Sequence, residues 1–404
     1  MDRTRRKFML SSIGVGGALV CGNAFAGVRE PGGPAALSSR TKSITVDVHE
    51  DSEFSCFEAN LTRCSAGGVI ATFGRAPAGS ETGDILAIRS EDGVTWRNLE
   101  PTRLFSRDQG GGTNYGHQLA SITFLADGTL IAFSTKFRFL FEGKVGWRRG
   151  SEMDGVYVSR SSDGGRNWGD AQRVDISPYR IGWTRGAAVE MPDGGLLLPL
   201  SGQKGDRYSE TDEPISTFLM RSVDGGLHWR FHSTLAADTR GGPDYDEPAM
   251  VSLGGGRLLC VLRSHQNPSR DPLGGYLYTT ISDDGGLNWS RPQKSSMWGN
   301  PANVIRLQDG RILCTYGYRM HPDPGVRGSV SADGVEWKPE ETFIVKALPD
   351  VASDRMQIGC PSSVQLADGR ILTAYQVWAK SEKREGDSGA RQERQCLEAS
   401  VYRI

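Results

Sequence analysis

The sequence predicts an all-β protein, a six-bladed β-propeller, on the basis of two interleaved repeats and a high glycine content. One repeat is a turn of the form S-x-D-x-G-x-x-W, and the other is a tight turn followed by a short apolar strand. The chain has 404 residues, of which 52 are glycine, about twice the usual share. Internal repeats at intervals of this kind are typical of solenoids and propellers, and abundant glycine suits tight turns between short strands.

The S-x-D-x-G-x-x-W turn occurs five times, at intervals of about 50–70 residues. We expect its aspartate to accept backbone N–H bonds, its glycine to adopt a positive φ, and its tryptophan to pack on the strands. These residues are therefore predicted to be structural rather than catalytic. Three copies are complete and two are shorter by one residue, namely Ser161–Trp168, Ser222–Trp229 and Ser282–Trp289, then Ser90–Trp96 and Ser331–Trp337.

The second repeat occurs six times and predicts six blades. Each copy places Asp-Gly or Gly-Gly between apolar runs, which is a β-hairpin signal. The six copies are Gly67–Ala71, Asp127–Ile131, Asp193–Leu197, Gly255–Leu259, Asp309–Leu313 and Asp368–Leu372. A further strand is predicted after each, at Ile85–Arg89, Gly155–Arg160, Thr217–Arg221, Tyr276–Ile281, Gly328–Val330 and Glu398–Tyr402.

The last unit runs out at the C-terminal strand Leu397–Ile404 and has no S-x-D-x-G-x-x-W turn. Ser43–His49 alternates apolar and polar residues and predicts a strand. We expect this strand to complete the last blade, because such closure joins the chain ends and protects the sheet edges. Three charged, irregular stretches, 136–152, 203–216 and 379–396, are predicted to be surface loops.

The N-terminus predicts a twin-arginine signal peptide over residues 1–26. Arg5-Arg6 precedes an apolar run that ends at Val20, and Ala24-Phe25-Ala26 supplies an A-x-A cleavage site. The apolar run is too short to span a bilayer, and the bulky Val20 disfavours a lipoprotein anchor on Cys21. We therefore expect a periplasmic or secreted protein.

The remaining chain divides into a flexible Pro-, Gly- and Ser-rich leader over 27–42 and the propeller over 43–404. No membrane span is expected in the mature chain. The formal net charge of −1 provides no basic field for nucleic acid. No cofactor motif occurs, and the cysteines form no C-x-x-C pair, so neither a cofactor nor a metal site is expected. Cys260 and Cys314 occupy the same place in two repeats, which favours buried free thiols.

Five such turns on six blades resemble the Asp-box repeats of the sialidase (neuraminidase) superfamily. The resemblance covers nearly the whole mature chain and implies blades of four antiparallel strands joined by Asp-box turns. Asp boxes also occur in other glycosidases, lyases and binding proteins, so they indicate the propeller rather than its activity.

Sialidases hold an acidic sugar with three arginines, protonate the leaving oxygen with an aspartate, and attack with a tyrosine that a glutamate activates. Arginine forks bind carboxylate with two hydrogen bonds. A tyrosine nucleophile avoids the repulsion that a second carboxylate would feel from the anionic substrate, so sialidases depart from the usual pair of carboxylates. The resemblance therefore implies a glycan substrate.

Several residues of this chain match that pattern. The segment Asp246–Arg263 resembles the family segment that holds the activating glutamate, here Glu247, and the second arginine, here Arg263. Arg327 precedes a strand and its Asp box, as the third arginine does. The pattern also places an accessory arginine and the acid/base aspartate between the first turn and its Asp box, where this chain has Arg75 and Asp84, with Glu81 as an alternative to Asp84.

Two positions depart from the pattern. Glu58 stands where sialidases have the first arginine, and a glutamate would repel a substrate carboxylate; the nearby Arg63 would lie further along the strand. Cys360 stands where the tyrosine is expected. A thiolate could attack there if cationic neighbours lowered the pKa of this cysteine.

Each of these residues also has a structural interpretation. Glu247 and Arg263 could form a structural ion pair, and Arg327 could be a solvated loop residue. Asp84 could be an ordinary turn residue, and Cys360 could be a buried thiol. His117, Tyr115, Arg185 and Arg319 are further residues that could line the site.

Three functions follow. The first is an exported glycoside hydrolase, exo-acting on an acidic sugar, with Asp84, Glu247 and Cys360 as catalytic residues. In this case Arg75, Arg263 and Arg327 bind the substrate. The alternatives are a propeller glycosidase or polysaccharide lyase with a different catalytic set, and a non-catalytic carbohydrate-binding propeller.

Overall fold

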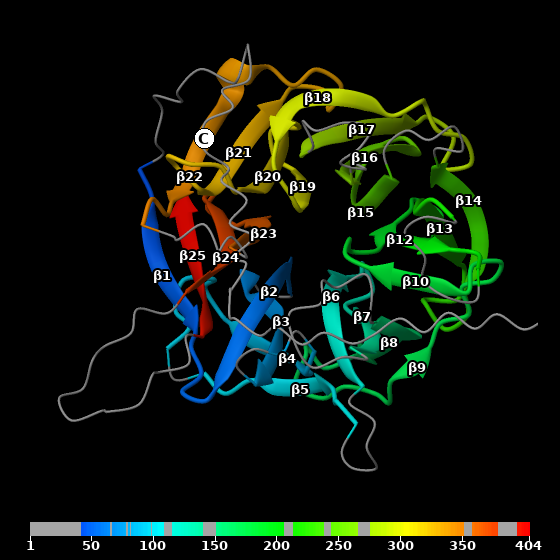
Figure 1. Ribbon diagram of the computed structural model, residues 1–404, viewed down its shortest axis with the longest axis horizontal. Coiled ribbons are helices and arrows are strands. Elements are labelled where there is room, and N and C mark those ends of the chain that lie inside the picture. Colours follow the sequence, from blue (N-terminus) through cyan, green and yellow to red (C-terminus); the bar gives the residue numbers. More distant parts are fainter. Residues whose placement is uncertain are drawn as a thin grey trace, which may run out of the picture. The chain divides into compact units, whose positions relative to one another are not determined.

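The computed structural model of the protein describes residues 42–64, 67–77, 80, 82–97, 99–108, 115–139, 151–205, 213–237, 244–265, 275–350, 358–378 and 394–404. All of them belong to one compact unit, Leu37–Ile404. The predicted signal peptide and nearly all of the predicted leader lie outside the described residues. Figure 1 looks along the axis of this unit, in which six antiparallel sheets follow one another around a centre. The predicted six-bladed propeller is confirmed.

The first three sheets, blades I to III, follow chain order from the innermost strand outward. Blade I contains β2 (Phe54–Arg63), β3 (Val69–Pro77), β4 (Asp84–Ser90) and β5 (Thr102–Phe105). Blade II contains β6 (Gly116–Phe124), β7 (Leu130–Phe139), β8 (Ser151–Ser161) and β9 (Gln172–Arg173). Blade III contains β10 (Ile181–Thr184) and β11 (Val189–Glu190), which both pair with β12 (Leu196–Gln203), then β13 (Ser216–Ser222) and β14 (Arg230–Ala236).

Blades IV to VI repeat the arrangement. Blade IV contains β15 (Asp244–Gly254), β16 (Arg257–His265), β17 (Tyr276–Ser282) and β18 (Gln293–Trp298). Blade V contains β19 (Ala302–Arg306), β20 (Ile312–Tyr318), β21 (Gly325–Ser331) and β22 (Thr342–Ala347), with the 3₁₀ turn Pro339–Glu341 before β22. Blade VI contains β23 (Gly359–Gln365), β24 (Ile371–Trp378), β25 (Gln395–Tyr402) and β1 (Ile44–His49).

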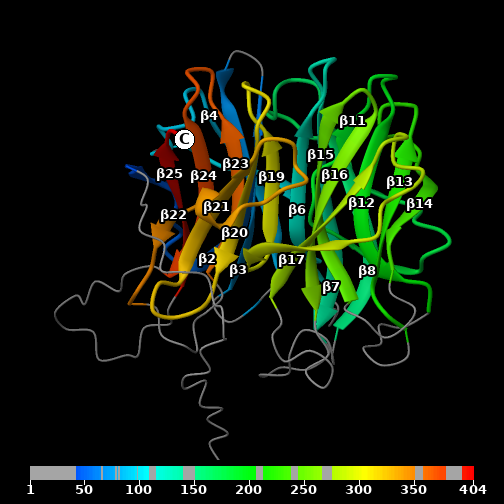
Figure 2. The ribbon, with the colours of Figure 1, turned by 90° about the horizontal axis from the view of Figure 1, so that it is seen from above.

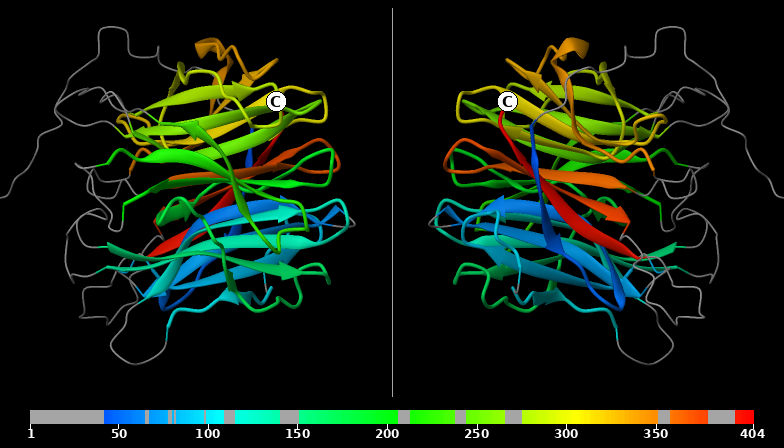
Figure 3. Two further views of the ribbon diagram at one scale, coloured as in Figure 1. Left: turned by 90° about the vertical axis from the view of Figure 1, so that its right-hand side faces the viewer. Right: turned by 90° about the vertical axis from the view of Figure 1, so that its left-hand side faces the viewer.

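The ring closes as predicted, through the N-terminal strand. Strand β1 pairs antiparallel with β25, with Ile44 opposite Val401 and Asp47 opposite Glu398. The right-hand view of Figure 3 shows β1 in blue beside β25 in red. Because β1 comes from the start of the propeller and β25 from its end, this pairing holds the two ends of the ring together.

The hydrophobic core consists of separate layers between neighbouring blades. Phe133 of blade II and Phe218 of blade III lie in one such cluster, and Phe73 of blade I and Leu397 of blade VI lie in another. Each blade packs on both faces, so inner strands such as β12 are buried along their whole length. This explains why their sequences are runs of apolar residues rather than alternating patterns.

The Asp-box turns are structural, as predicted. In the blade IV turn, the carboxylate of Asp284 accepts hydrogen bonds from the backbone N–H groups of Asn288 (2.9 Å) and Leu287 (3.1 Å) and from the hydroxyl of Ser282 (2.8 Å). These hydrogen bonds, led by that from Asn288, lower the pKa of Asp284 to about 2. The indole N–H of Trp289 donates to Gly286 O at 3.0 Å. The Asp284 carboxylate, the Ser282 hydroxyl and the Trp289 indole N–H are therefore used within the turn.

Parts of the three predicted surface loops belong to strands. Arg138 on β7 lies opposite Glu152 on β8, and their side chains form an ion pair of 2.6 Å. The charges that suggested a loop over 136–152 are thus partly a cross-strand pair. Likewise Gln203 ends β12 and Ser216 begins β13, while β25 begins at Gln395. Residues 140–150, 206–212 and 379–393 lie outside the described residues.

Two further expectations concern cysteines and membranes. Cys260 and Cys314 are buried free thiols, as predicted. Across the described ranges, no helix is long and apolar enough to cross a membrane.

Candidate functional site

Four inner strands carry a β-bulge at the same place, and each bulge holds a non-glycine residue in the left-handed region. These residues are Glu58 on β2 (φ 55°), Leu119 on β6 (φ 56°), Glu247 on β15 (φ 44°) and Cys360 on β23 (φ 48°). Such conformations cost about 1–3 kcal/mol each and cluster at functional sites. A bulge also changes the direction in which a side chain points.

The bulge residues share a position in the repeat. They lie nine residues before Gly67, Gly128, Gly256 and Gly369, the glycines of positive φ in the tight turns that follow their strands. In blade III the same count from Gly194 reaches Arg185. Counting back from the turns therefore finds Glu58, Arg185, Glu247 and Cys360, a signal that the motif comparison does not use.

Glu58 and Arg185 form an ion pair although their blades are not neighbours. Arg185 Nη1 lies 3.6 Å from Glu58 Oε1, and Leu119 N donates to Glu58 Oε2 at 3.3 Å. The side chains of Arg185 and Glu58 are 9% and 14% exposed. Burial opposes the charge of Arg185, but Glu58 and the more weakly acting groups Cys360 and Glu247 raise the pKa of this arginine above its ordinary value. The pair therefore bridges from blade I to blade III.

Glu247 and Arg263 form a second ion pair, on neighbouring strands of blade IV. Arg263 Nη1 lies 2.9 Å from Glu247 Oε2. The adjacent Asp246 accepts from the indole N–H of Trp183 and from Glu247 N, both at 2.7 Å. Burial again opposes the charge, while Glu247 and Asp246 raise the pKa of Arg263. The Glu247 carboxylate is thus fixed by a guanidinium.

Cys360 lies between two arginines. Arg319 Nη2 donates to Cys360 Sγ at 3.6 Å, and the guanidinium of Arg185 also interacts with the thiol. Burial raises the pKa of Cys360, and the two arginines oppose that rise without reversing it. Since Glu58 and Glu247 also act on this thiol, six residues from five blades form one group, which we call the central cluster. Its members are Glu58, Arg185, Glu247, Arg263, Arg319 and Cys360.

The central cluster contains three of the six predicted site residues, namely Glu247, Arg263 and Cys360. Arg327 lies in the same blade as Arg319, but its guanidinium stacks on the Tyr318 ring, with Cζ 3.4 Å from the ring centroid. The catalytic and binding roles of all these residues remain predictions.

Arg75 and Asp84 lie opposite one another on β3 and β4 of blade I. Arg75 Nε bonds Asp51 Oδ2 at 2.7 Å. Asp84 Oδ1 accepts from the backbone N–H of Arg107 at 2.9 Å, and its Oδ2 lies 3.4 Å from Arg103 Nε. Both side chains are therefore occupied by partners outside the central cluster. Glu81, the alternative to Asp84, lies outside the described residues.

His117 is a buried residue of β6 in blade II, and Tyr115 directly precedes that strand. The His117 ring is stacked on Phe105 at 5.1 Å, between blades I and II. Burial, together with Lys136, lowers the pKa of His117 to about 3. Arg138 lies over the Tyr115 ring, with 4.9 Å between Cζ and the centroid. His117 is therefore a neutral core residue near neutral pH.

Two buried polar atoms at the central cluster have no hydrogen-bond partner in the described part of the chain. They are Arg319 Nε, in the cluster, and Oε1 of Gln118, whose Nε2 donates to Glu58 Oε1 at 3.5 Å. An unpaired buried polar group costs about 1–3 kcal/mol. A ligand with both donors and acceptors would supply the missing partners, so these atoms support a binding site for a polar molecule.

No group of three or more His, Cys, Asp or Glu side chains among the described residues has the geometry to hold a metal ion. The polar groups at the centre are guanidinium, carboxylate, amide and thiol groups. Guanidinium groups bind the carboxylates of organic ligands. Carboxylate and thiol groups can transfer protons to or from such ligands.

A family model described as a BNR repeat-like domain matches residues 122–373. The chain belongs to this family. A comparison with curated proteins finds no match. The predicted BNR-type (Asp-box) propeller is confirmed as the family, and the resemblance to sialidases is confirmed as a likeness of fold.

Solved structures share the fold of this BNR repeat-like propeller. A protein of unknown function from Dyadobacter fermentans is 24% identical, with a TM-score of 0.73 over 90% of this chain and 99% of its own. The Hadza microbial sialidase Hz136 is 15% identical, with a TM-score of 0.60 over 87% of this chain and 66% of its own. An alpha-L-arabinanase of Penicillium chrysogenum, solved with arabinobiose, is 14% identical, with a TM-score of 0.57 over 89% of this chain and 98% of its own. Since the last two are named for different glycosidase activities, the fold leaves the substrate to the site residues.

Proposed function

We propose that this BNR repeat-like propeller is an exported glycoside hydrolase that acts on the end of a glycan bearing an acidic sugar. The observation that carries the proposal is the convergence of Glu247, Arg263 and Cys360 on one buried cluster with Glu58, Arg185 and Arg319. Strained bulges hold three of these residues, which is typical of functional sites.

The charges of the central cluster support an acidic substrate. Arg185 and Arg263 are each paired with a glutamate. Among the described residues, Arg319 has no carboxylate partner, and its Nε is buried and unpaired. A substrate carboxylate can bind such a guanidinium with two hydrogen bonds. Glu58 was expected to repel this carboxylate, but its charge is balanced by Arg185.

The catalytic roles follow from the same contacts. Arg263 holds the Glu247 carboxylate in place, so Glu247 is suited to accept a proton at Oε1 or Oε2. We assign Cys360 as the group that it deprotonates, because the thiol needs a base when burial raises its pKa. The leaving oxygen requires an acid. Asp84 is the predicted residue, and Glu58 is the other carboxylate in contact with the cluster.

The experiment offers the purified protein a fluorogenic sialoside and a panel of uronic-acid oligosaccharides. Release of a reducing sugar that falls at least 100-fold in Glu247→Gln supports the proposal. Comparison of Asp84→Asn with Glu58→Gln identifies the acid. Formation of an unsaturated product that absorbs in the ultraviolet would identify a lyase instead, and binding without turnover would identify a binding propeller.

Export is proposed from the twin-arginine pattern at Arg5-Arg6. Expression of the full chain and of an Arg5→Lys, Arg6→Lys variant, followed by fractionation, tests it. The proposal requires the first to leave the cytoplasm and the second to remain there.

A further inference from the structure

A pocket lies further along the inner strands, away from the central cluster. It has a volume of about 460 Å³, and its walls include Arg63 of β2, Arg306 of β19, and Gln365 of β23. Arg63 follows Glu58 by five residues on β2, and Gln365 follows Cys360 by five on β23. At about 3.3 Å per residue, the pocket is roughly 16 Å along the strands from the central cluster. Figure 2 shows the strands from the side; Arg63 is the last residue of β2 and Gln365 the last residue of β23, whereas Cys360 is the second residue of β23.

Arg63 and Arg306 are exposed and have no carboxylate partner among the described residues. The aspartates of the two adjoining turns, in blades V and VI, are already paired, because Asp309 lies 2.7 Å from Arg311 Nη2 and Asp368 lies 2.6 Å from Arg370 Nε. The pocket therefore carries two uncompensated positive charges. Such charges favour an anionic ligand.

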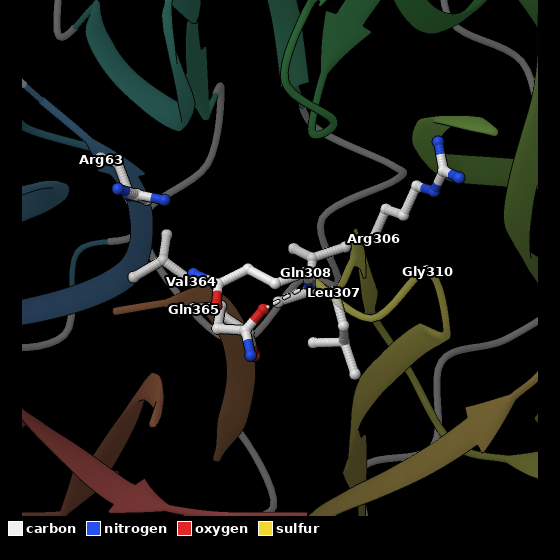
Figure 4. A pocket seen from close by; sticks show the side chains of 9 residues that line it. Arg63, Arg306, Leu307, Gln308, Gly310, Val364 and Gln365 are labelled. Carbon is white, nitrogen blue, oxygen red and sulfur yellow. Dashed lines mark hydrogen bonds between the residues drawn. The ribbon is translucent and has the colours of Figure 1, made fainter. Parts of the chain in front are cut away.

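The floor between the two arginines is held rigidly. Gln308 N donates to Gln365 Oε1 at 2.7 Å, the bond drawn dashed in Figure 4, and Gln365 Nε2 donates to Gly369 O at 3.1 Å. In the same view the Arg63 side chain reaches from β2 toward Val364 and Gln365, while Arg306 extends to the other side. These bonds leave one lone pair on Gln365 Oε1 and one N–H on its Nε2 for a ligand, in set positions.

Apolar groups complete the walls, since Val364 and Ile305 also line the pocket. A sugar presents an apolar ring face, hydroxyl groups that bind amides, and in acidic sugars a carboxylate. Apolar side chains, amides and guanidinium groups together match these three features. With the arginines on two sides of Gln308, the pocket suits an oligosaccharide that has acidic groups on separate residues.

We propose that this pocket is a second, non-catalytic binding site for a carboxylate-bearing oligosaccharide, at the opposite end of the ring from the central cluster. It would hold an acidic chain to the protein whether or not that chain is cleaved. The inference therefore rests on Arg63, Arg306 and the glutamine floor, and not on the proposed hydrolysis.

The test measures binding of hexagalacturonate by calorimetry to full-length protein carrying Glu247→Gln, which prevents turnover. Arg63→Ala and Arg306→Ala are each expected to weaken binding about tenfold, because each removes charge-assisted hydrogen bonds to the ligand. Arg370→Ala is the matched control, since it removes an arginine of the same end that is already paired. It should change the affinity less than twofold.

Three results would overturn the proposal: no binding, equal weakening by all three variants, or weakening by Arg319→Ala but not by Arg63→Ala. The last would place the ligand in the central cluster. The affinities of a sulfated hexasaccharide and of a neutral hexasaccharide are measured in the same way. Equal affinity for the neutral chain contradicts an anion site, and preference for the sulfated chain contradicts the assignment to carboxylates. Turnover of a monosaccharide glycoside should be unchanged by Arg63→Ala, which separates this site from the proposed function.

Discussion

At the scale of single residues, Glu58 shows how a substituted position can remain compatible with an anion site. Its carboxylate lies 3.6 Å from Arg185 Nη1, so blade III supplies a positive charge that compensates the negative charge on blade I. Neither residue is a match to the family pattern at its own position, and only the structure shows that they meet. A sequence does not reveal such a pair because the partners are far apart in the chain and lie in blades that are not neighbours.

Removing Glu58 should destabilise the protein. Glu58→Gln leaves Arg185 with its charge largely buried and uncompensated, and we expect a loss of about 2–4 kcal/mol in the free energy of unfolding. Urea denaturation measures it. The control is Asp47→Asn, whose partner Arg97 is 82% exposed; this variant should lose less than about 1 kcal/mol. The double variant that carries both Glu58→Gln and Arg185→Gln completes a double-mutant cycle. If it is no more stable than the sum of the two single changes predicts, the pair does not interact.

His117 should make the protein sensitive to acid. Its folded pKa is about 3 and its ordinary value is 6.5, so protonation favours the unfolded chain. The contribution of neutral His117 is complete above pH 6.5 and is lost as the pH falls toward 3, by about 2 kcal/mol at pH 5. Denaturation curves at pH 7.5 and 5 measure this loss. His117→Gln should reduce the pH dependence of the free energy of unfolding, and equal pH dependence in wild type and His117→Gln would contradict the assignment.

At the scale of elements, turn chemistry made the strands predictable, and bulge geometry made the central residues hard to predict. The tight turns and Asp boxes have fixed residue types, so both repeats, the ring closure by β1 and the free thiols followed from the sequence. The bulges at Glu58, Leu119, Glu247 and Cys360 have no residue type common to all four. Since left-handed conformations usually select glycine, four non-glycine residues of three types gave no signal except their constant distance from the turns.

The closing strand β1 provides an element-scale prediction. Val48 on β1 is 3% exposed and packs in the cluster between blades VI and I, whereas Ile44 on the same strand is 67% exposed. Val48→Asp should therefore lower the free energy of unfolding by more than about 3 kcal/mol, because it buries an unpaired carboxylate. Ile44→Asp should change it by less than about 1 kcal/mol. Chemical denaturation compares the two, and equal effects would show that β1 does not close the ring in solution.

At the scale of the whole molecule, one fold carries both candidate sites at opposite ends of its inner strands. The sequence identified the propeller and three residues of the central cluster by their likeness to the sialidase pattern. The sequence placed Arg75 and Asp84 in blade I, where the structure also has them. It could not show that Arg75 is bonded to Asp51, or that Asp84 is bonded to Arg103 and to the backbone of Arg107. Side-chain partners of that kind depend on the packing of outer strands, which the motifs do not describe.

Because five blades contribute to the central cluster, a ligand bound there should stabilise the entire ring. An acidic monosaccharide that binds only the folded protein adds about 2.7 kcal/mol at a concentration 100 times its Kd. The unfolding midpoint of the wild type and of Arg370→Ala should therefore rise in the presence of the ligand. In Arg319→Ala the rise should disappear, since this variant lacks the guanidinium that has no carboxylate partner among the described residues. A neutral sugar of the same size should produce a much smaller rise in every variant. A full rise in Arg319→Ala would mean that the acidic group of the ligand binds elsewhere, and the charge argument for the substrate would then fail.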